Sequence, residues 1–348
     1  MNILLIIGNG FDLNLGLPTD YGHFYQYYLA PQVGADTRII GKELAGDLLN
    51  GSSNWADLEK QLGQISVKYN KAEAYIDDID HISDELTRYM RAVDSLDIPH
   101  IEDIAQIVYH DLSRFTDYLD NGKRNDMNAF LQQRSDKGEI HLDVITFNYT
   151  SVFERIMECW SNLPVHGPIK EYTLCHIHQK LDEHGILLGV NDVNQIANAA
   201  FRNNYEVKAT IVKPFINKDY ESGIDKDCEK AIKQADIIIL FGSSMGDTDL
   251  YWWNFIGDSM NGHPKRLVYC PYDRNPTAET KKILRINNRL VNFVLSRMSL
   301  DANGYVNVGS KILPLRENRL FDFRTPKDRM KANFAEAMAQ LGIVNYKR

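Results

Sequence analysis

Short, uninterrupted runs of apolar residues recur along this chain, and they limit its fold more than any other feature. Runs rich in β-branched residues occupy positions 3–7, 142–146, 173–177, 186–188, 237–241 and 266–270. Continuous rather than alternating hydrophobicity indicates strands covered on both faces, as in a parallel sheet. Several runs are followed by a glycine or polar turn and then by a helical pattern, which is typical of β-α-β units. We therefore expect an α/β protein with a parallel sheet flanked by helices, and residues 292–295 are expected to add an edge strand.

The pattern changes between residues 51 and 137, where helical spacing replaces the strand-like runs. A first helix is expected to start at a cap formed by Asn54, and a second is expected over residues 72–93. A third follows Pro99 and is expected to end at Gly122, because glycine commonly occupies the position after the last helical turn. No long Ser- or Pro-rich linker flanks this stretch. We interpret it as an all-helical insertion packed on the core.

Charge, hydropathy and cysteine usage exclude several classes of protein. The formal net charge of −8 disfavours general binding to nucleic acid or to an anionic membrane, which needs a basic surface. No stretch approaches 18 apolar residues, and the run at 3–7 is too short for a signal peptide, so we expect a cytoplasmic protein without a membrane partner. The cysteines are scattered without a Cys-x-x-Cys pair and are expected to be free thiols of a reducing compartment. They are Cys159, Cys175, Cys228 and Cys270.

The strongest local signal is Gly8-Asn9-Gly10-Phe11-Asp12, directly after the first apolar run. Glycines between a buried strand and a helix allow backbone amides to approach a phosphate, and the helix N-terminus favours negative charge. The third glycine of a dinucleotide-binding Gly-x-Gly-x-x-Gly motif is missing, because Leu13 occupies its place. An ordinary dehydrogenase is therefore disfavoured. The alternative is a tight strand-to-helix turn that holds no ligand.

These residues open a series of motifs that resembles the AbiH family, which is named for bacteriophage abortive infection. The series continues in order through Gly16–Thr19, Asn54–Glu59, Thr146–Thr150, His176–His178 before Gly189, and Phe241–Gly246 with Asp249. It spans about residues 1–255. The resemblance implies an anti-phage role in abortive infection, with a phage component as the trigger.

The order of the motifs is also distantly similar to sirtuin-like NAD-binding domains. That similarity implies a Rossmann-like sheet with NAD bound at the carboxyl ends of the strands. It would place the pyrophosphate at Gly8 and Gly10, the ribose and a water at Asn148, and the general base at His178. The chain lacks zinc-ribbon cysteines, and Thr150 stands where sirtuins usually have Asp, so protein deacylation is disfavoured.

Candidate site residues follow from these motifs and their positions at expected strand ends. Asn148 and His178 are the candidate catalytic residues. His166 is a second candidate base because Gly167 follows it, as in the family, whereas Gln179 follows His178. The candidate nucleotide-binding residues are Gly8, Asn9, Gly10, Phe11, Asp12, Thr19, Thr146, Gly242, Ser243, Ser244 and Asp249.

Each catalytic candidate also has a purely structural interpretation. Asn148 could satisfy the amides of a turn, and a histidine in an apolar strand is commonly a core residue. His176 and His178 are two residues apart and are expected to point to one face of the strand. No third clustered ligand accompanies them, so we expect no metal site.

The acidic candidates have structural alternatives as well. Ser151 and Glu154 form the pattern of a capping box at a helix start. Asp12 and Asp249 each follow a glycine turn and could either cap helices or contact ribose hydroxyls. Tyr251 and the two tryptophans after it are expected to be core residues rather than a base-stacking surface.

These patterns divide the chain into four expected parts. Residues 1–50 and 138–310 form a Rossmann-like core, residues 51–137 form the helical insertion, and residues 311–348 form a C-terminal tail. The tail is expected to end in a helix capped at Thr325 and followed by Gly342.

The favoured hypothesis is an anti-phage protein that binds NAD or a related nucleotide and hydrolyses its N-glycosidic bond. Asparagine, histidine and a glycine turn supply the residue types that such a reaction needs. The alternative is a non-catalytic module that senses a nucleotide or a phage component and acts by assembly, including as a homo-oligomer, or by partner binding. A nuclease ranks last, because Asp57 and Glu59 are the only suggestive carboxylate pair and would face different ways on a helix.

Overall fold

The fold is built on a six-stranded sheet in which every strand pair is parallel. The computed structural model describes residues 1–49, 58–134, 139–160, 168–181, 185–219, 223–272, 283–315, 320–323 and 329–343. The strand order is β3-β2-β1-β4-β5-β6. The strands are β1 (Asn2–Ile7), β2 (Ile140–Thr146), β3 (Ile169–His176), β4 (Ile237–Phe241), β5 (Arg266–Cys270) and β6 (Ile312–Pro314). The expected α/β class with a parallel sheet flanked by helices is confirmed.

The central position of strand β1 in the sheet explains why residues 3–7 are all apolar. It pairs with β2 on one side and with β4 on the other. Ile3, Leu5 and Ile7 pack into the core on one face, whereas Leu4 and Ile6 pack into the core on the opposite face. Because both faces are covered, no polar alternation is needed. The strand order reverses between β1 and β4, which opens a crevice at their carboxyl ends.

Seven α-helices occupy the described chain between β1 and β2. They are α1 (Gly10–Asn14), α2 (Tyr21–Tyr28), α3 (Ile39–Leu49), α4 (Leu58–Ile65), α5 (Ala72–Asp94), α6 (Ile101–Ser113) and α7 (Asn121–Gln132). The later helices are α8 (Val152–Trp160), α9 (Tyr205–Ile211), α10 (Lys213–Asp219), α11 (Ile224–Gln234), α12 (Leu250–Met260), α13 (Ile283–Ser296), α14 (Ala302–Gly309) and α15 (Arg329–Gln340).

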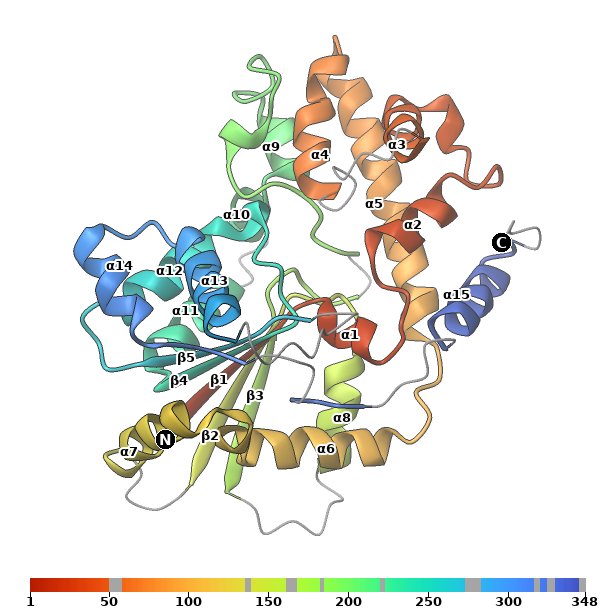
Figure 1. Cartoon of the computed structure of the whole chain (residues 1–348). Helices are drawn as coiled ribbons and strands as arrows, with labels where there is room; N and C mark the ends of the chain where they lie inside the picture. Colours follow the sequence, from red (N-terminus) through yellow and green to blue (C-terminus); the bar gives the residue numbers. More distant parts are fainter. Residues whose placement is uncertain are drawn as a thin grey trace.

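The helices form layers around the sheet (Figure 1). Helices α6 and α8 contribute to the core on one face, and α11, α12, α13 and α14 contribute to the core on the other. Helices α2 to α5, together with α9, stand beyond the carboxyl ends of the strands (Figure 1). The sheet therefore presents its strand ends to a helical region rather than to open solvent.

The helical stretch differs from expectation at its third helix. Helices α4 and α5 are present as predicted, although Asn54 lies outside the described residues. Helix α6 already ends at Ser113, and Gly122 lies in the first turn of α7. The reason is local, because the Asp120 side chain accepts a hydrogen bond from the Lys123 amide and starts a new helix there. The prediction that Gly122 ends a helix is wrong.

Two of the expected strands are also wrong. Residues 186–188 form a buried loop in which the Leu187 amide donates to the His178 carbonyl. Residues 292–295 lie in helix α13, where Val294 and Leu295 face the core. Short apolar runs do not distinguish strands from buried loops or helix faces. The outer strand on this side is β6, which the sequence patterns did not indicate.

The structure contains the predicted C-terminal helix, and its helices can be compared with the length that a membrane span requires. Helix α15 buries Phe334 and Met338, and Gly342 follows it with a φ of 76°. The expected cap at Thr325 lies outside the described residues. Among the described helices, none combines the length and the apolar character needed to cross a bilayer.

Candidate functional site

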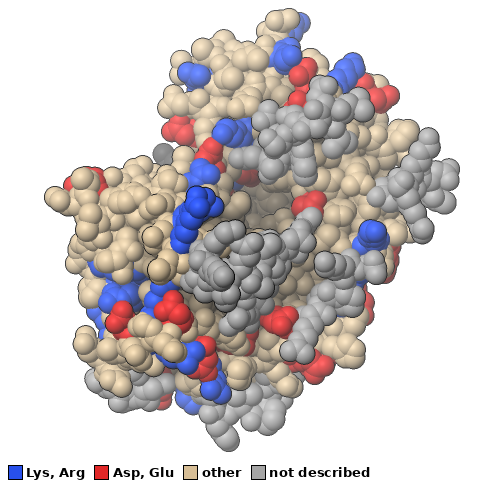
Figure 2. Space-filling view, in the orientation of Figure 1, with Lys and Arg blue, Asp and Glu red and all other residues tan. Residues whose placement is uncertain are grey.

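A cavity of about 440 Å³ lies at the carboxyl ends of the parallel strands. Its walls come from the segments that follow β1, β2, β3, β4 and β5, together with residues of α4 and α5. A hollow near the centre of the molecule is visible in the space-filling view (Figure 2). The predicted site residues that line the cavity are Gly8, Asn9, Gly10, Asp12, Thr19, Asn148, His178, Gly242, Ser243, Ser244 and Asp249.

Two glycine turns meet at the floor of this cavity. The Gly8 amide donates to the Phe241 carbonyl at 2.9 Å, and the Gly10 amide donates to the Gly242 carbonyl at 2.8 Å. A Cβ added to Gly10 would lie 2.6 Å from the Cα of Gly242, so the close approach of the turns requires glycine. The amides of Gly8 and Gly10 are thus already hydrogen-bonded within the protein.

Two predicted residues, Phe11 and Thr146, support the strand-end turns without lining the cavity, whereas Asn9 and Thr19 line it and support the first glycine turn. The Phe11 ring packs edge-on against Phe153 and Phe241 in the core. The Thr146 hydroxyl accepts a hydrogen bond from the Asn148 amide at 3.0 Å. Asn9 lines the cavity, and its side-chain amide donates to the Thr19 carbonyl at 3.2 Å. Asn9 and Thr19 therefore fix the first glycine turn to the loop after α1.

Asp12 forms a buried polar group with two residues of the segment after β2. Its carboxylate accepts hydrogen bonds from Asn148 Nδ2 at 3.0 Å and from Thr150 Oγ1 at 2.7 Å. Burial raises the pKa of Asp12 to about 7, although both hydrogen bonds act to lower it. The other polar atom of this amide, Asn148 Oδ1, is buried and has no hydrogen-bond partner among the described residues. Asp12 can therefore gain or lose a proton near neutral pH.

His178 lies on the other side of the cavity and pairs with Asp249. His178 Nε2 lies 3.2 Å from Asp249 Oδ1. The imidazole also contacts the Phe147 ring edge-on, and Phe147 in turn stacks on Trp253. His178 Nδ1 is buried and has no hydrogen-bond partner in the described part of the chain. A ring held in this way has one nitrogen left for a ligand.

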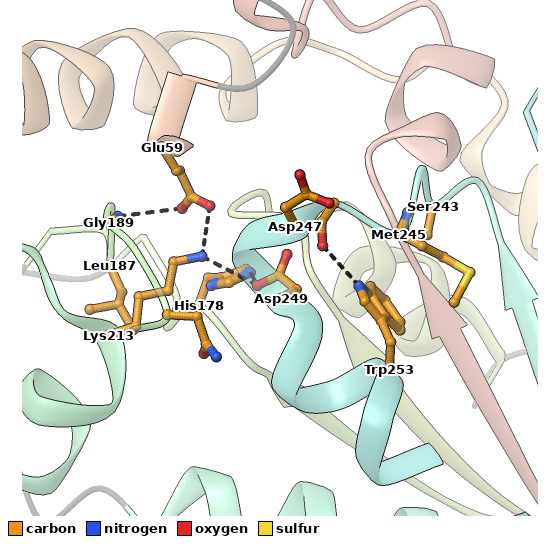
Figure 3. Close-up of polar contacts among 12 residues, drawn as sticks. Glu59, His178, Leu187, Gly189, Lys213, Ser243, Met245, Asp247, Asp249 and Trp253 are labelled. Carbon is orange, nitrogen blue, oxygen red and sulfur yellow. Dashed lines mark hydrogen bonds and ion pairs between the residues drawn. The ribbon is translucent and has the colours of Figure 1, made fainter. Parts of the chain in front are cut away.

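Two charged residues that sequence reasoning did not assign to the site complete this side. Lys213 Nζ lies 2.7 Å from Glu59 Oε2 and 3.3 Å from Asp249 Oδ1 (Figure 3). Glu59 Oε1 also accepts a hydrogen bond from the Gly189 amide at 3.4 Å. Glu59, Lys213, Asp249 and His178 thus form one buried chain of polar contacts, which we call the ion cluster.

The charges of the ion cluster stabilise one another. Burial alone would raise the pKa of Asp249, but the charge of Lys213 and the hydrogen bond from His178 hold it well below its usual range. Burial alone would lower the pKa of Lys213, but Asp249 and Glu59 raise it. Glu59 lies in a motif that the sequence singled out, whereas no local pattern marks Lys213. Only the fold brings α10 to this position.

His176 does not share the site with His178. Its Nδ1 lies 3.0 Å from the Asn148 carbonyl, and its Nε2 lies 2.8 Å from Glu154 Oε1. The prediction that both histidines point to one face is wrong, because β3 ends at His176 and residues 177–178 already form a turn. No group of three metal-ligating side chains occurs in the described residues.

The structure also shows the contacts of the predicted helix caps at Ser151 and Asp249. The Ser151 hydroxyl donates to Asp94 at 2.8 Å, and Glu154 binds His176 and Lys180. This pair therefore links neighbouring elements rather than forming the expected capping box. Asp249 makes no side-chain cap to α12 and instead belongs to the ion cluster. His166 lies outside the described residues.

The walls of the cavity are acidic. The described residues that line it include Asp12, Glu59 and Asp249 but neither Lys nor Arg. The exposed Ser244 and the half-buried Ser243 lie at the turn after β4. Beside them, Asp247 binds Lys60 at 2.6 Å and also pairs with Arg297. The cavity lining therefore holds carboxyl groups but neither Lys nor Arg, while cationic side chains lie near the β4 turn.

Two comparisons with known proteins bear on this site. The family model described as "Bacteriophage abortive infection AbiH" matches residues 4–270. This range contains the whole ion cluster. It also contains all residues that line the cavity except Pro271 and Tyr272. A search of curated proteins finds no match.

Proposed function

The chain belongs to the bacteriophage abortive infection AbiH family, and from this premise we propose that it binds NAD⁺ in the strand-end cavity and hydrolyses its N-glycosidic bond. Family membership implies a function in abortive infection of phage-infected cells. Loss of the NAD⁺ pool would halt the metabolism that phage replication needs. The proposal joins this cellular role to the chemistry of one cavity.

The observation that carries the proposal is a pair of buried polar atoms without partners. Asn148 Oδ1 and His178 Nδ1 both belong to residues that line the same cavity. Buried polar atoms are nearly always hydrogen-bonded, so two orphaned acceptors or donors at one cavity indicate a missing ligand. A ribose with its hydroxyls, and a water beside it, would satisfy both.

The topology supports a dinucleotide at this position. The strand order β3-β2-β1-β4-β5-β6 is that of a Rossmann-like sheet, in which dinucleotides bind where the order reverses. Since the amides of Gly8 and Gly10 are already bonded, the phosphates would instead contact the hydroxyls of Ser243 and Ser244. The cations that bind Asp247 lie near this turn and would favour the phosphates there.

The acidic wall supports NAD⁺ rather than a neutral nucleoside. The nicotinamide ring of NAD⁺ carries a positive charge, and breaking its glycosidic bond shifts positive charge onto the ribose. Carboxylates aimed at that position stabilise the oxocarbenium-like transition state more than the bound substrate. Asp12, Glu59 and Asp249 are the carboxyl groups along the wall, and Lys213 balances part of the charge of the last two.

Asp249, His178 and Asn148 have separate roles in the proposed reaction. Asp249 accepts a hydrogen bond from His178 Nε2–H, which leaves Nδ1 as a base. A water held between Nδ1 and Asn148 Oδ1 attacks the anomeric carbon, and its proton passes to His178. The C–N bond breaks with its electron pair going to nicotinamide. The products are nicotinamide, ADP-ribose and one proton.

The test compares NAD⁺ in phage-infected cells that carry the wild-type protein, Asn148→Ala or His178→Gln. We expect NAD⁺ to fall and free nicotinamide to rise only with the wild type, and protection against phage to be lost in both variants. The matched control is Asn307→Ala, the same substitution on the exposed side of α14, which should behave as wild type. Infected cells are used because such an enzyme should be inactive at rest.

Two outcomes would contradict hydrolysis. An unchanged NAD⁺ pool, with the wild type and Asn148→Ala protecting equally, would remove the cavity from the anti-phage function. Calorimetry that shows binding of NAD⁺ or ADP-ribose without turnover, even in infected-cell extract, would instead support a nucleotide-sensing module. Circular dichroism of each variant confirms that the fold is retained.

A further inference from the structure

Two of the four cysteines lie against each other, away from the strand-end cavity. Cys175 is in β3 and Cys228 is in α11, and their Sγ atoms are 3.1 Å apart. Both are free thiols, although 53 residues separate them in the chain. A disulfide needs sulfur atoms about 2.05 Å apart, so a movement of about 1 Å would permit the bond.

A second cavity gives access to one member of this pair. It has a volume of about 870 Å³ and is lined by Cys175, together with residues such as His176, Lys180 and Lys230. Cys175 is half-buried, whereas Cys228 is fully buried behind it. A small oxidant that enters the cavity therefore meets the Cys175 sulfur first. This arrangement of an accessible thiol with a second thiol behind it is typical of reversible oxidation sites.

We propose that Cys175 and Cys228 are a modification site at which peroxide forms a reversible disulfide between β3 and α11. The Cys175 thiol first loses its proton, and the thiolate attacks one oxygen of hydrogen peroxide. The O–O bond breaks, and the departing hydroxide takes up that proton, which gives a sulfenic acid and one water. The Cys228 thiol then attacks the sulfenic sulfur, which forms the S–S bond and releases a second water. The two thiols lose two electrons and two protons in total, and the peroxide is reduced to water.

The surroundings of Cys175 favour the first step. The hydrogen bond from the Cys228 thiol lowers the pKa of Cys175, although burial and the charges of Asp227 and Asp225 oppose this effect. Cys159 offers a contrast. It is also half-buried, but burial raises its pKa and its Sγ bonds to the Arg155 carbonyl, with no thiol beside it.

The bond would act on a part of the structure that supports the strand-end cavity. Cys175 directly precedes His176, which holds the Asn148 carbonyl. On the other side, Asp225 of α11 accepts a hydrogen bond from Asn217 of α10. The disulfide would therefore fix β3 against α11 next to these contacts. The inference stands on the two thiols alone and does not depend on the proposed hydrolysis of NAD⁺.

The experiment treats the full-length native protein with a small excess of hydrogen peroxide, denatures it and alkylates the remaining thiols with iodoacetamide. Mass spectrometry of the peptides then identifies which cysteines were protected. We expect Cys175 and Cys228 to disappear together from the alkylated peptides and to appear as one cross-linked pair. Cys159 and Cys270 should remain alkylated. Dithiothreitol should restore all four thiols, and the oxidised protein should melt at a higher temperature than the reduced one.

Two variants keep the test decisive. In Cys228→Ser the sulfenic acid on Cys175 has no partner, so dimedone should trap it there, whereas Cys159→Ser should form the disulfide as the wild type does. If Cys228→Ser does not fold, the peptide map of the wild type decides alone. The proposal is overturned if Cys175 and Cys228 both stay alkylated after peroxide, or if Cys159 is oxidised as fast as Cys175.

Discussion

Ionisation of Asp12 is opposed by its surroundings, unlike that of Asp249 on the other side of the cavity. The described hydrogen-bond donors to Asp12 are the neutral side chains of Asn148 and Thr150, whereas Asp249 has the Lys213 ammonium beside it. The two carboxylates therefore differ in pKa, with Asp12 raised to about 7 and Asp249 held low. Carboxylates kept in different protonation states are a common arrangement in active sites.

Replacing Asp12 by asparagine should change how stability depends on pH. The pKa of Asp12 is raised in the folded protein, so the folded state keeps a proton that the unfolded chain has already released above about pH 4. Its contribution to stability is therefore greatest at low pH and declines as the pH rises towards 7. Between pH 5 and 8 the free energy of unfolding of the wild type should fall by about 2–3 kcal/mol more than that of Asp12→Asn.

Urea unfolding of both proteins at several pH values measures this difference. The two stability curves should run closest to parallel above pH 8, where Asp12 is ionised in both states. Parallel curves over the whole range from pH 5 to 8 would contradict the raised pKa of Asp12. Circular dichroism at each pH checks that both proteins start from the same folded state.

Sequence reasoning placed single residues at the strand ends but missed residues that come together from distant parts of the chain. The resemblance to sirtuin-like domains assigned roles to Asn148 and His178. Each follows an apolar run, and parallel strands place such positions at one edge, where both residues line the cavity. Lys213 was missed because its partners, Glu59 and Asp249, are far away in the chain. A buried lysine carries no local sequence signal. Only the packing of α10 shows that its charge is paired.

At the scale of elements, the turns after β1 and β4 act as one unit. Gly242 has a φ of 67°, and its Cβ position would lie 2.9 Å from the backbone of Gly10. The Gly10 amide bonds to the Gly242 carbonyl across the same contact. The sequence pattern of the first turn was interpreted as a phosphate-binding motif. The structure gives a second reason why glycine is needed in this turn, which is its close contact with the turn after β4.

Alanine at Gly242 should destabilise the protein without changing the net charge of the cavity. The positive φ and the overlap with Gly10 should together cost roughly 2–4 kcal/mol of unfolding free energy. The control is Gly46→Ala in α3, where nothing lies within 4 Å of the added Cβ. That variant should be stabilised by roughly 0.5–1 kcal/mol because alanine is the better helix former.

Thermal and urea unfolding of Gly242→Ala and Gly46→Ala measure both changes in stability. Equal effects in Gly242→Ala and Gly46→Ala would show that the two turns can separate without cost. The glycines would then be free to open towards a phosphate, which would favour the original sequence interpretation of the first turn.

Two of the strands that the sequence located correctly, β1 and β4, share one physical property. Residues 3–7 of β1 and all of β4 are buried on both faces, so these positions are all apolar and the signal is uninterrupted. The wrong predictions at 186–188 and 292–295 were also apolar, but they are a buried loop and a helix face. A short apolar run therefore indicates that a segment is buried, whatever its secondary structure. Hydrogen-bonding partners, which define a strand, depend on the rest of the chain.

At the scale of the whole molecule, the ion cluster joins the helical region to the sheet. Glu59 belongs to α4, Lys213 to α10, and Asp249 to the segment between β4 and α12, while His178 follows β3. Figure 3 shows these side chains pointing toward one another. Burying an unpaired charge is energetically unfavourable, so the ion pairs of the cluster stabilise the contacts between these elements.

Replacing Lys213 by methionine should therefore destabilise the whole molecule. It would leave the carboxylates of Glu59 and Asp249 buried without their shared cation, which should cost about 3–5 kcal/mol of unfolding free energy at pH 7. The matched control is Lys60→Met, which removes an ion pair with Asp247 whose lysine side chain is 45% exposed. That change should cost less than about 1 kcal/mol, because solvent screens exposed pairs.

The pH dependence of the Lys213 penalty separates lost charge from lost packing. In the wild type, Lys213 holds the pKa of Asp249 low, so the stability that this pairing gives is present above about pH 4 and is lost only on further acidification. In Lys213→Met the unpaired carboxylates take up protons more readily in the folded state. Lowering the pH from 7 to 5 should then reduce the difference in unfolding free energy between the two proteins. A difference that stays constant over this range would mean that Lys213 acts through packing, and that the contact between α4 and the strand ends does not depend on buried charge.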